Sequence, residues 1–435
     1  MHRKLVCLSL LVICGRAFAQ DVSMFRGNLQ HAGVYESAGV RKFNRVKWQF
    51  HTRGMVIGSP GLSGGLVYVG SDDGNFYAID AQSGAQRWKF EVKSRVPSTP
   101  AIAGGRVYFT AYDGNVYALD AASGALKWKF QTGGERRFSG KNLHGTQPAA
   151  ETMPDPFDCY LSSPAVWNGA VYFGSGDGNV YALDAASGAL RWKFKTGDVV
   201  HASPAIADGM VFIGSWDSYF YAIDAASGQE KWKFKTGEDH DTYNQVGIQS
   251  SAAVADGMVY FGCRDSHLYA LDARSGEKKW AFSANGSWVV GSPAVREGQV
   301  YFPTSDSSLL YEVDARTGKV LRSLGFNHWY LYSSPALAGD VLYIGSTQGK
   351  VAAVGLGDMK VSWSYDTDAS KQHSAEYVKP DGTPNGEALF HSDFYDDMVS
   401  GVERVMSLGA ILSSPVVAGD VVYVGSADGN VYALT

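Results

Sequence analysis

Histidine, arginine and tryptophan side chains interrupt an otherwise regular series of turns in this chain. Where the common turn is Asp-Gly, three turns instead read Trp216-Asp-Ser, Arg264-Asp-Ser and Ser305-Asp-Ser. Aromatic rings, imidazoles and guanidinium groups around a hollow are what the binding of a ligand or peptide requires. The sequence therefore predicts a candidate binding surface made of these and other such side chains, namely His201, Trp216, Arg264, His267, Trp288, His328, Trp329, Tyr330, Tyr377 and His391.

No catalytic constellation accompanies these residues. The chain has no His-Glu-x-x-His motif, no Cys-x-x-Cys motif and no phosphate-cradling glycine loop. The histidines are scattered without the spacing of metal ligands, and the aspartates of the turns are ordinary turn residues. We therefore predict no catalytic residue, no metal site and no cofactor.

These side chains must be positioned by a repeated unit. The unit is clearest from Thr99 to Phe130, where β-branched and aromatic runs alternate with Gly-Gly and Asp-Gly turns, which is typical of four short strands A to D. The period is about 40 residues. Eight small-residue dipeptides open the units: Ser59-Pro60, Thr99-Pro100, Ser163-Pro164, Ser203-Pro204, Ser251-Ala252, Ser292-Pro293, Ser334-Pro335 and Ser414-Pro415.

Four short strands cannot bury both faces of a sheet alone, so neighbouring units must stack. The sequence predicts an all-β fold, an eight-bladed β-propeller of four-stranded antiparallel blades in one domain over residues 20–435. The last unit stops at Leu434 without a strand D, whereas residues 44–50 have the strand-D pattern and no strands before them. We expect residues 44–50 to complete the eighth blade, which removes an exposed sheet edge.

Tryptophans recur at one position of strand D, usually four residues after a glycine, as in Gly84 and Trp88. A ligand-binding site lined by these rings is one interpretation of such a series. Because the position repeats in nearly every blade, we prefer the structural interpretation, in which each ring docks one blade on another and the glycine leaves room. The residues are Trp48, Trp88, Trp128, Trp192, Trp232, Trp280 and Trp363; the sixth blade has Arg322 instead.

The strand order places A-to-B and C-to-D turns on one face of the ring, and B-to-C and D-to-A connections on the other, here called the D-to-A face. Three D-to-A connections are long: residues 131–161, 235–249 and 364–412, here the first, second and third insertions. Long loops in a compact repeat fold are usually functional or disordered. We therefore expect binding on the D-to-A face.

The first nineteen residues resemble a secretory signal, with Arg3 and Lys4 before an apolar run and Ala17-Phe-Ala19 as the cleavage site. Lipoprotein anchoring at Cys14 is the alternative. Removal of residues 1–19 takes the formal net charge from −5 to −8, which disfavours nucleic-acid binding. No further apolar stretch is long enough to span a bilayer. We expect a periplasmic or secreted protein that is a monomer.

Two cysteines remain beyond the signal segment, Cys159 in the first insertion and Cys263 in the fifth blade. An oxidising compartment would allow them to form a disulfide. Two unpaired thiols are the alternative, and the sequence leaves both open.

The unit D-G-N-V-Y-A-L-D-A-x-x-G-x-x-x-W-x-F resembles the pyrroloquinoline-quinone-like (PQQ-like) repeat family over nearly the whole mature chain. The segment Met24-Phe-Arg-Gly-Asn28 is also similar to the opening segment of such proteins. The family includes quinoprotein dehydrogenases, which use the quinone and calcium, and non-catalytic BamB-like scaffolds.

The resemblance implies two functions. Many alcohol-oxidising members of the family carry an adjacent Cys-Cys pair, whereas Cys159 and Cys263 are far apart here. The family's calcium-binding set also has no residue-by-residue match in this chain. We therefore expect a BamB-like scaffold that binds protein partners of the cell envelope through the D-to-A face. A PQQ-dependent alcohol or sugar dehydrogenase is the alternative, and carbohydrate binding through Trp216, Trp288 and Trp329 is a weaker one.

Overall fold

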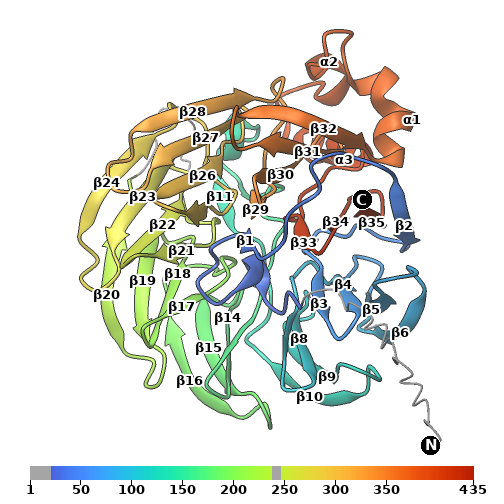
Figure 1. The fold of residues 1–435 in the computed structure, drawn as a ribbon. Coiled ribbons are helices and arrows are strands. Elements are labelled where there is room, and N and C mark those ends of the chain that lie inside the picture. Colours follow the sequence, from blue (N-terminus) through green and yellow to red (C-terminus); the bar gives the residue numbers. More distant parts are fainter. Residues whose placement is uncertain (1–20, 238–245) are drawn as a thin grey trace, which may run out of the picture.

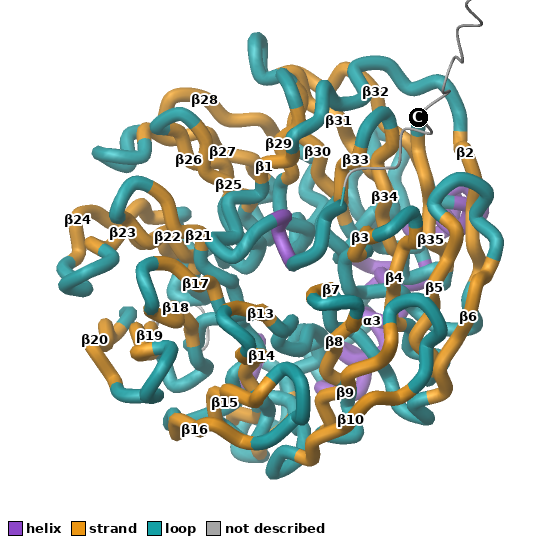
Figure 2. The backbone as a smooth tube through the Cα atoms, turned by 60° about the horizontal axis from the view of Figure 1, so that its bottom comes forward, coloured by secondary structure: helices purple, strands orange, loops and turns teal. Residues whose placement is uncertain are grey.

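The structure is a computed structural model that describes residues 21–237 and 246–435. In that part of the chain, eight four-stranded sheets stand in a ring (Figures 1 and 2). Blades one to four consist of β3 (Gly61–Ser63), β4 (Leu66–Gly70), β5 (Asn75–Asp80) and β6 (Gln86–Glu91); β7 (Ala101–Ala103), β8 (Arg106–Thr110), β9 (Asn115–Asp120) and β10 (Leu126–Gln131); β13 (Ala165–Trp167), β14 (Ala170–Gly174), β15 (Asn179–Asp184) and β16 (Leu190–Lys195); and β17 (Ala205–Ala207), β18 (Met210–Gly214), β19 (Tyr219–Asp224) and β20 (Glu230–Lys235).

Blades five to eight repeat this plan, and the predicted eight-bladed fold is confirmed. Their strands are β21 (Ala253–Ala255), β22 (Met258–Gly262), β23 (His267–Asp272) and β24 (Lys278–Ser283); β25 (Ala294–Arg296), β26 (Gln299–Pro303), β27 (Leu309–Asp314) and β28 (Val320–Gly325); β29 (Ala336–Ala338), β30 (Val341–Ser346), β31 (Lys350–Gly355) and β32 (Lys360–Asp366); and β33 (Val416–Ala418), β34 (Val421–Gly425), β35 (Asn430–Leu434) and β2 (Val46–His51).

The eighth blade contains strands from both ends of the chain. Strand β2 pairs antiparallel with β35, with Trp48 opposite Ala433 and His51 opposite Asn430. The backbone N–H of Asn44 also donates to the carbonyl of Thr435 at 2.6 Å. The predicted closure of the ring by residues 44–50 is therefore confirmed, one residue beyond its expected end.

The aspartates of the turns hold each blade in shape. In the second blade, the carboxylate of Asp113 accepts from the backbone of Asn115 at 3.0 Å and from the Tyr117 hydroxyl at 2.5 Å. Asp120 accepts from the backbone and the hydroxyl of Ser123 at 3.0 and 2.9 Å. The hydrophobic core lies between neighbouring sheets, where Phe rings of adjacent blades stack at 4.0–4.1 Å.

The strand-D tryptophans connect neighbouring blades. The Trp88 indole N–H donates to the carbonyl of Ala121 in the next blade at 3.1 Å, and its ring lies where a Cβ on Gly124 would stand, 2.6 Å from the nearest ring atom. The glycine that makes room thus belongs to the next blade, and not to the tryptophan's own turn. The same N–H donation is made by Trp48, Trp128, Trp192, Trp232, Trp280 and Trp363, the last to Val40.

Hydrogen bonds join most of the unit-opening residues to the next one around the axis. The backbone N–H of Ser59 donates to the Thr99 hydroxyl at 2.9 Å, and that of Thr99 donates to the Ser163 hydroxyl at 3.0 Å. The pattern continues through Ser203, Ser251, Ser292 and Ser334, and Ser414 donates back to Ser59. The small hydroxyl residue in the sequence repeat is thereby explained.

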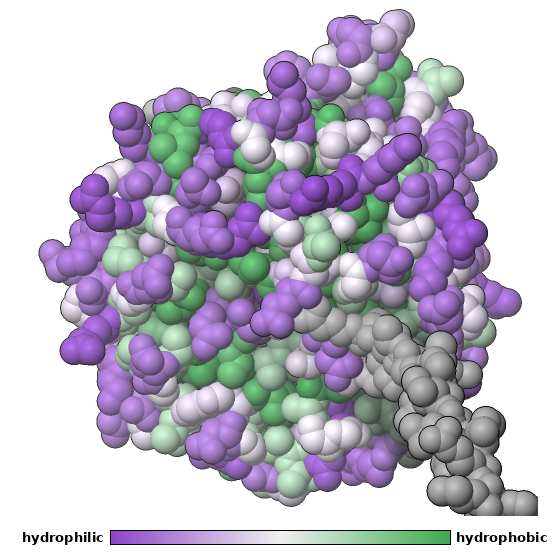
Figure 3. All heavy atoms as spheres, viewed as in Figure 1, coloured by the Kyte–Doolittle hydropathy of each residue, from purple (hydrophilic) through white to green (hydrophobic). Residues whose placement is uncertain are grey.

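The N-terminal segment crosses the axis on the face opposite the insertions. It contains η1 (Phe25–Gly27) and β1 (Val34–Tyr35), which runs parallel to β29. The innermost strands of six blades donate to its carbonyls, through the backbone N–H groups of Leu62, Ile102, Ile206, Val254, Val295 and Leu337. In the view of Figure 3, hydrophilic side chains dominate the outer rim of the ring.

The first and third insertions fold into small structures of their own. The first contains β11 (Ser139–Lys141), η2 (Leu143–Gly145) and β12 (Thr152–Pro154), and the third contains α1 (Asp368–Tyr377), α2 (Gly386–Leu389) and α3 (Tyr395–Ser407). Gln147 exchanges two backbone hydrogen bonds with Asp393 and Tyr395, at 2.8 and 2.9 Å. The two insertions therefore lie on the same face. No helix among the described residues is long and apolar enough to cross a membrane.

Candidate functional site

The first insertion covers the opening of the central channel on the D-to-A face, and an ion pair lies at its centre. Arg264, only 1% exposed, donates from Nη1 to Asp155 Oδ2 at 2.6 Å. Its guanidinium carbon lies 3.8 Å from the ring centre of Trp288 and 4.8 Å from that of Trp216. Arginine stacks on aromatic faces in this way because its planar cation is weakly hydrated. The cation and the two rings thus form one layer.

His144 provides Asp155 with a second partner. The imidazole Nε2 lies 3.2 Å from Asp155 Oδ1, and the ring packs edge-on against Phe157 with centroids 5.0 Å apart. Burial alone would raise the pKa of Asp155, but Arg264 and His144 outweigh it and hold that pKa well below its usual range. Asp155 is therefore an ionised, structural carboxylate.

A second buried pair anchors the first insertion to the fourth blade. His201 Nδ1 lies 2.7 Å from Asp158 Oδ1, and the backbone N–H of Phe138 donates to Asp158 Oδ2 at 2.7 Å. Glu135 lies 3.5 Å from the other imidazole nitrogen. Burial alone would lower the pKa of His201, but Asp158 and Glu135 outweigh it and raise the pKa to about 10. His201 is thus a buried cation that holds the insertion.

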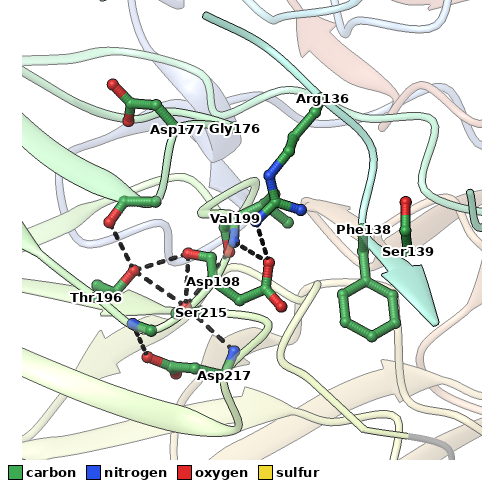
Figure 4. Close-up of polar contacts among 12 residues, drawn as sticks. Arg136, Phe138, Ser139, Gly176, Asp177, Thr196, Asp198, Val199, Ser215 and Asp217 are labelled. Atoms are coloured by element: carbon green, nitrogen blue, oxygen red, sulfur yellow. Dashed lines mark hydrogen bonds and ion pairs between the residues drawn. The ribbon is translucent and has the colours of Figure 1, made fainter. Parts of the chain in front are cut away.

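An exposed pair adds a third attachment (Figure 4). Arg136 donates to Asp198 Oδ1 at 2.6 Å, and the Asp198 carbonyl accepts from the Thr196 hydroxyl at 2.8 Å. The Ser215 hydroxyl lies 3.3 Å from that of Thr196, so the connection between blades three and four is tied to the insertion.

Aromatic side chains close the layer. Phe138 stacks on Trp216 with centroids 4.6 Å apart, and Phe157 packs against Trp288 and Tyr332 at 5.8 and 6.1 Å. The Tyr160 hydroxyl donates to the carbonyls of Tyr332 and Leu412. Below them, a cavity of about 40 Å³ runs between Tyr160 and Phe25 and is lined by the ring of hydroxyls. That volume suits water and is too small for a ring-shaped organic molecule.

The structure gathers four of the predicted surface residues, but in a covered position. His201, Trp216, Arg264 and Trp288 meet beneath the first insertion. Trp329 is buried apart from them under the third insertion, where its indole donates to Gly382 at 2.8 Å. The other five residues are half-buried or exposed: His267, His328, Tyr330, Tyr377 and His391. Of these, Tyr330 packs against the cluster of Trp288 and Tyr332, and Tyr377 packs against the cluster of Trp329.

The partners of these residues in the first insertion were not found from the sequence. Asp155, Asp158, His144 and Glu135 lie in a stretch without repeat, so no internal consensus made them stand out. One pattern could have indicated them. Asp155 and Asp158 lie three residues apart on either side of Phe157, on the face where His201 and Arg264 were expected.

The two cysteines are free thiols in the structure. Cys159 packs beside Ile57, Ala410 and Leu412, whereas Cys263 lies in the core between blades four and five. The disulfide alternative is therefore not formed. Within the described residues, no group of three or more His, Cys, Asp or Glu side chains is arranged to hold a metal ion.

A family model described as outer membrane protein assembly factor BamB matches residues 38–153, 160–284 and 244–435. The chain belongs to the BamB family. The predicted PQQ-like propeller family is thereby confirmed. The signal-peptide prediction lies outside the described residues.

Solved structures similar to this BamB-family chain include both kinds of PQQ-like propeller. BamB from Moraxella catarrhalis has 16% identity and a TM-score of 0.63, covering 90% of this chain and 97% of that one. A europium-containing methanol dehydrogenase has 16% identity and a TM-score of 0.67, covering 95% and 98%. The quinohemoprotein alcohol dehydrogenase from Comamonas testosteroni has 14% identity and a TM-score of 0.67, covering 95% and 80%. No curated protein matches by sequence.

Proposed function

We propose that this BamB-family chain is a non-catalytic scaffold of the cell envelope, periplasmic or secreted and monomeric, that binds protein partners through its D-to-A face. The observation that carries the proposal is the occupied channel mouth: Arg264, Trp288 and Phe157 fill the axial position that a substrate pocket would need. Two insertions joined to each other then present a broad outer surface. A rigid ring with one irregular face suits protein recognition.

The third insertion supplies the strongest candidate anchor on that surface. Phe394, which precedes α3, is 59% exposed, and exposed aromatic residues often carry a large share of interface binding energy. The inner side of α3 is buried through Val402 and Val405, so the helix is fixed and its outer side is free for a partner.

Site-specific photo-crosslinking in cells tests the proposal. A photoreactive amino acid at position 394 is expected to give a defined protein adduct, because position 394 lies on the D-to-A face. The same amino acid at Ser123, an exposed turn residue of the opposite face, is the matched control. Adducts from position 123 but none from position 394 would contradict the proposed docking face.

Removal of the third insertion is the second test. The Thr367 hydroxyl lies 3.2 Å from the Leu408 carbonyl, so residues 368–407 can be replaced by a short glycine-serine turn without opening the ring. We expect the variant to keep its fold by circular dichroism and to lose the adducts seen with its partner. Undiminished partner capture would count against this surface.

A quinone-dependent dehydrogenase is the second candidate, because two of the similar solved structures are a methanol dehydrogenase and an alcohol dehydrogenase. The residues present do not fit the cofactor, since the mouth is filled by the layer around Arg264 and the cavity beneath is about 40 Å³. Dye reduction with pyrroloquinoline quinone, calcium and alcohols or sugars tests it, and turnover above that of heat-treated protein would favour the dehydrogenase. For carbohydrate binding, Trp216, Trp288 and Trp329 are 1%, 6% and 2% exposed and offer no free ring face.

A further inference from the structure

A cleft separates α3 from the first insertion on the D-to-A face. Its outer lobe, about 490 Å³, is lined by Arg95, Tyr112, Arg137 and Tyr395. Its inner lobe, about 330 Å³, shares both arginines and is otherwise mostly apolar, with Met55, Ile57, Pro156, Cys159, Val402 and Met406 in its wall. These volumes are those of small-molecule sites. The closed channel mouth is a different place and contributes neither lobe.

Hydrogen bonds between the two insertions fix the walls of the cleft. The Tyr395 hydroxyl donates to the Pro154 carbonyl at 2.6 Å. Gln147 adds its two backbone hydrogen bonds to the segment that precedes α3. A site whose walls are held in this way loses little conformational entropy when a ligand enters.

The two arginines are the charged groups shared by both lobes, and neither has a close carboxylate partner. The Arg95 guanidinium stacks on the Tyr112 ring at 4.1 Å, and Asp72 Oδ2 lies at the ion-pair limit of 4.0 Å from its Nη1. Among residues 21–237 and 246–435, no carboxylate lies within 4.0 Å of the Arg137 guanidinium. Arginine matches a carboxylate through parallel N–H groups, and a partly buried pair is stronger than an exposed one.

Asp72 marks the same place from below. Its side chain is only 7% exposed, and neither carboxylate oxygen has a hydrogen-bond partner among the described residues. Burial raises the pKa of Asp72 to about 6, against the opposing influence of Arg95 and Arg137. Asp72 therefore does not occupy the N–H donors of Arg95. The Arg95 side chain is 38% exposed, so its donors can reach an anion in the cleft.

Two acidic residues of α3, Asp396 and Glu403, also line the cleft. Both are exposed at its rim, where water and salt screen their charge. The arginines lie between the rim and the apolar lobe, so they are the charges that a ligand reaching the inner lobe meets.

We propose that this cleft binds a small organic acid, with the carboxylate on Arg95 and Arg137 and an apolar body in the inner lobe. The carboxylate belongs either to a free acid or to the end of a short peptide. This site does not depend on the proposed scaffold function, because a ligand in the cleft needs no partner on the surface.

Matched acid and amide probes test the proposal by calorimetry on the full chain. Hexanoate and hexanamide represent the free acid, and N-acetyl-Leu-Phe and its C-terminal amide represent the peptide. We expect at least one acid to bind about tenfold more tightly than its amide, which corresponds to about 1.4 kcal/mol. Tighter binding of hexanoate would identify a free acid, and tighter binding of the peptide acid would identify a peptide end.

Variants locate the binding. Arg95→Gln and Arg137→Gln are each expected to weaken the acid about tenfold, and Met406→Trp to block the inner lobe while both arginines remain. Arg87→Gln removes an exposed arginine of the opposite face and is expected to change nothing. Asp72→Asn removes the nearby negative charge and is expected to tighten binding. Equal affinity for acid and amide, no binding of either acid to the folded protein, or full affinity in Met406→Trp would overturn the proposal.

Discussion

The backbone N–H of Ser414 donates a hydrogen bond of 2.8 Å to the hydroxyl of Ser59, 355 residues away in the chain. This bond joins the eighth blade to the first within the series of hydroxyls that the repeated unit-opening dipeptides place around the axis. The residues on both sides are buried, so an N–H left without an acceptor there is costly.

Ser59→Ala is expected to lower the free energy of unfolding by about 1–3 kcal/mol, because it leaves the Ser414 N–H buried without a partner. Ser59→Thr keeps the hydroxyl, and Thr99 performs the same role in the next blade. Ser59→Thr is therefore expected to lower the free energy of unfolding much less than Ser59→Ala does. Denaturant unfolding of both variants measures the difference, and equal losses would mean that the hydroxyl is not the stabilising group.

Gly84→Ala tests the docking of blade eight on blade one. A Cβ at Gly84 would lie 2.7 Å from Trp48 Cγ, and the residue has a φ of +74°. Gly104→Ala is the control, because its φ is +56° but no atom lies within 4 Å of its added Cβ. We expect Gly84→Ala to cost about 1–3 kcal/mol more than the control, through the clash alone. Similar midpoints of urea unfolding for the two variants would show that the Trp48 ring can move aside without loss of stability.

Arg264→Met is expected to destabilise the protein by about 3–5 kcal/mol, because it leaves the Asp155 carboxylate buried without its main cation. Adding Asp155→Asn should recover part of the loss, so the double variant gives a coupling energy of about 0.5–3 kcal/mol. The exposed pair of Arg191 and Asp184, with Nη2 and Oδ2 2.8 Å apart, provides a matched double-mutant cycle. Its coupling should be below about 1 kcal/mol. Equal coupling in the two cycles would contradict a tightly packed mouth.

The pair of His201 and Asp158 predicts a dependence of stability on pH. The pKa of His201 is about 10 in the folded protein and about 6.5 in an unfolded chain, so the folded state binds the extra proton between these values. The contribution is therefore complete below about pH 6.5 and is lost as the pH rises towards 10. Between pH 7 and 9, the free energy of unfolding of the wild type should fall by roughly 1 kcal/mol per pH unit more than that of His201→Gln. Denaturant unfolding at a series of pH values measures the difference. Parallel profiles for the two proteins would exclude a protonated His201.

The blades could be predicted from the sequence because their information is local and repeated. The turn aspartates, the strand alternation and the strand-D pattern around Trp48 all lie within a few residues of the contacts they make. The repeat also predicted the ring closure, because the strand-D pattern around Trp48 has no strands A to C before it and the last unit, which ends at Leu434, has no strand D. The direction of docking was missed: the glycine beside each indole belongs to the following blade, as Gly124 does for Trp88.

The covered mouth could not be predicted for the opposite reason. The contact between Arg264 and Asp155 joins residues 109 positions apart, and the first insertion has no repeat with which to compare it. Unusual side chains at the channel suggested exposure to a ligand, whereas the chain supplies its own partners there. Whether the remaining exposed residues, such as His391, take part in recognition stays a prediction.

The strap of residues 22–35 sets an order on biosynthesis. Its carbonyls accept from Leu62 and Ile102 near its start and from Leu337 near its end, so the strap can be engaged progressively as successive blades are made. Strand β2 has a different requirement, because its partner β35 is made last. A polypeptide that leaves the ribosome or a translocation pore from its N-terminus must therefore keep residues 46–51 unpaired until the final strand has emerged.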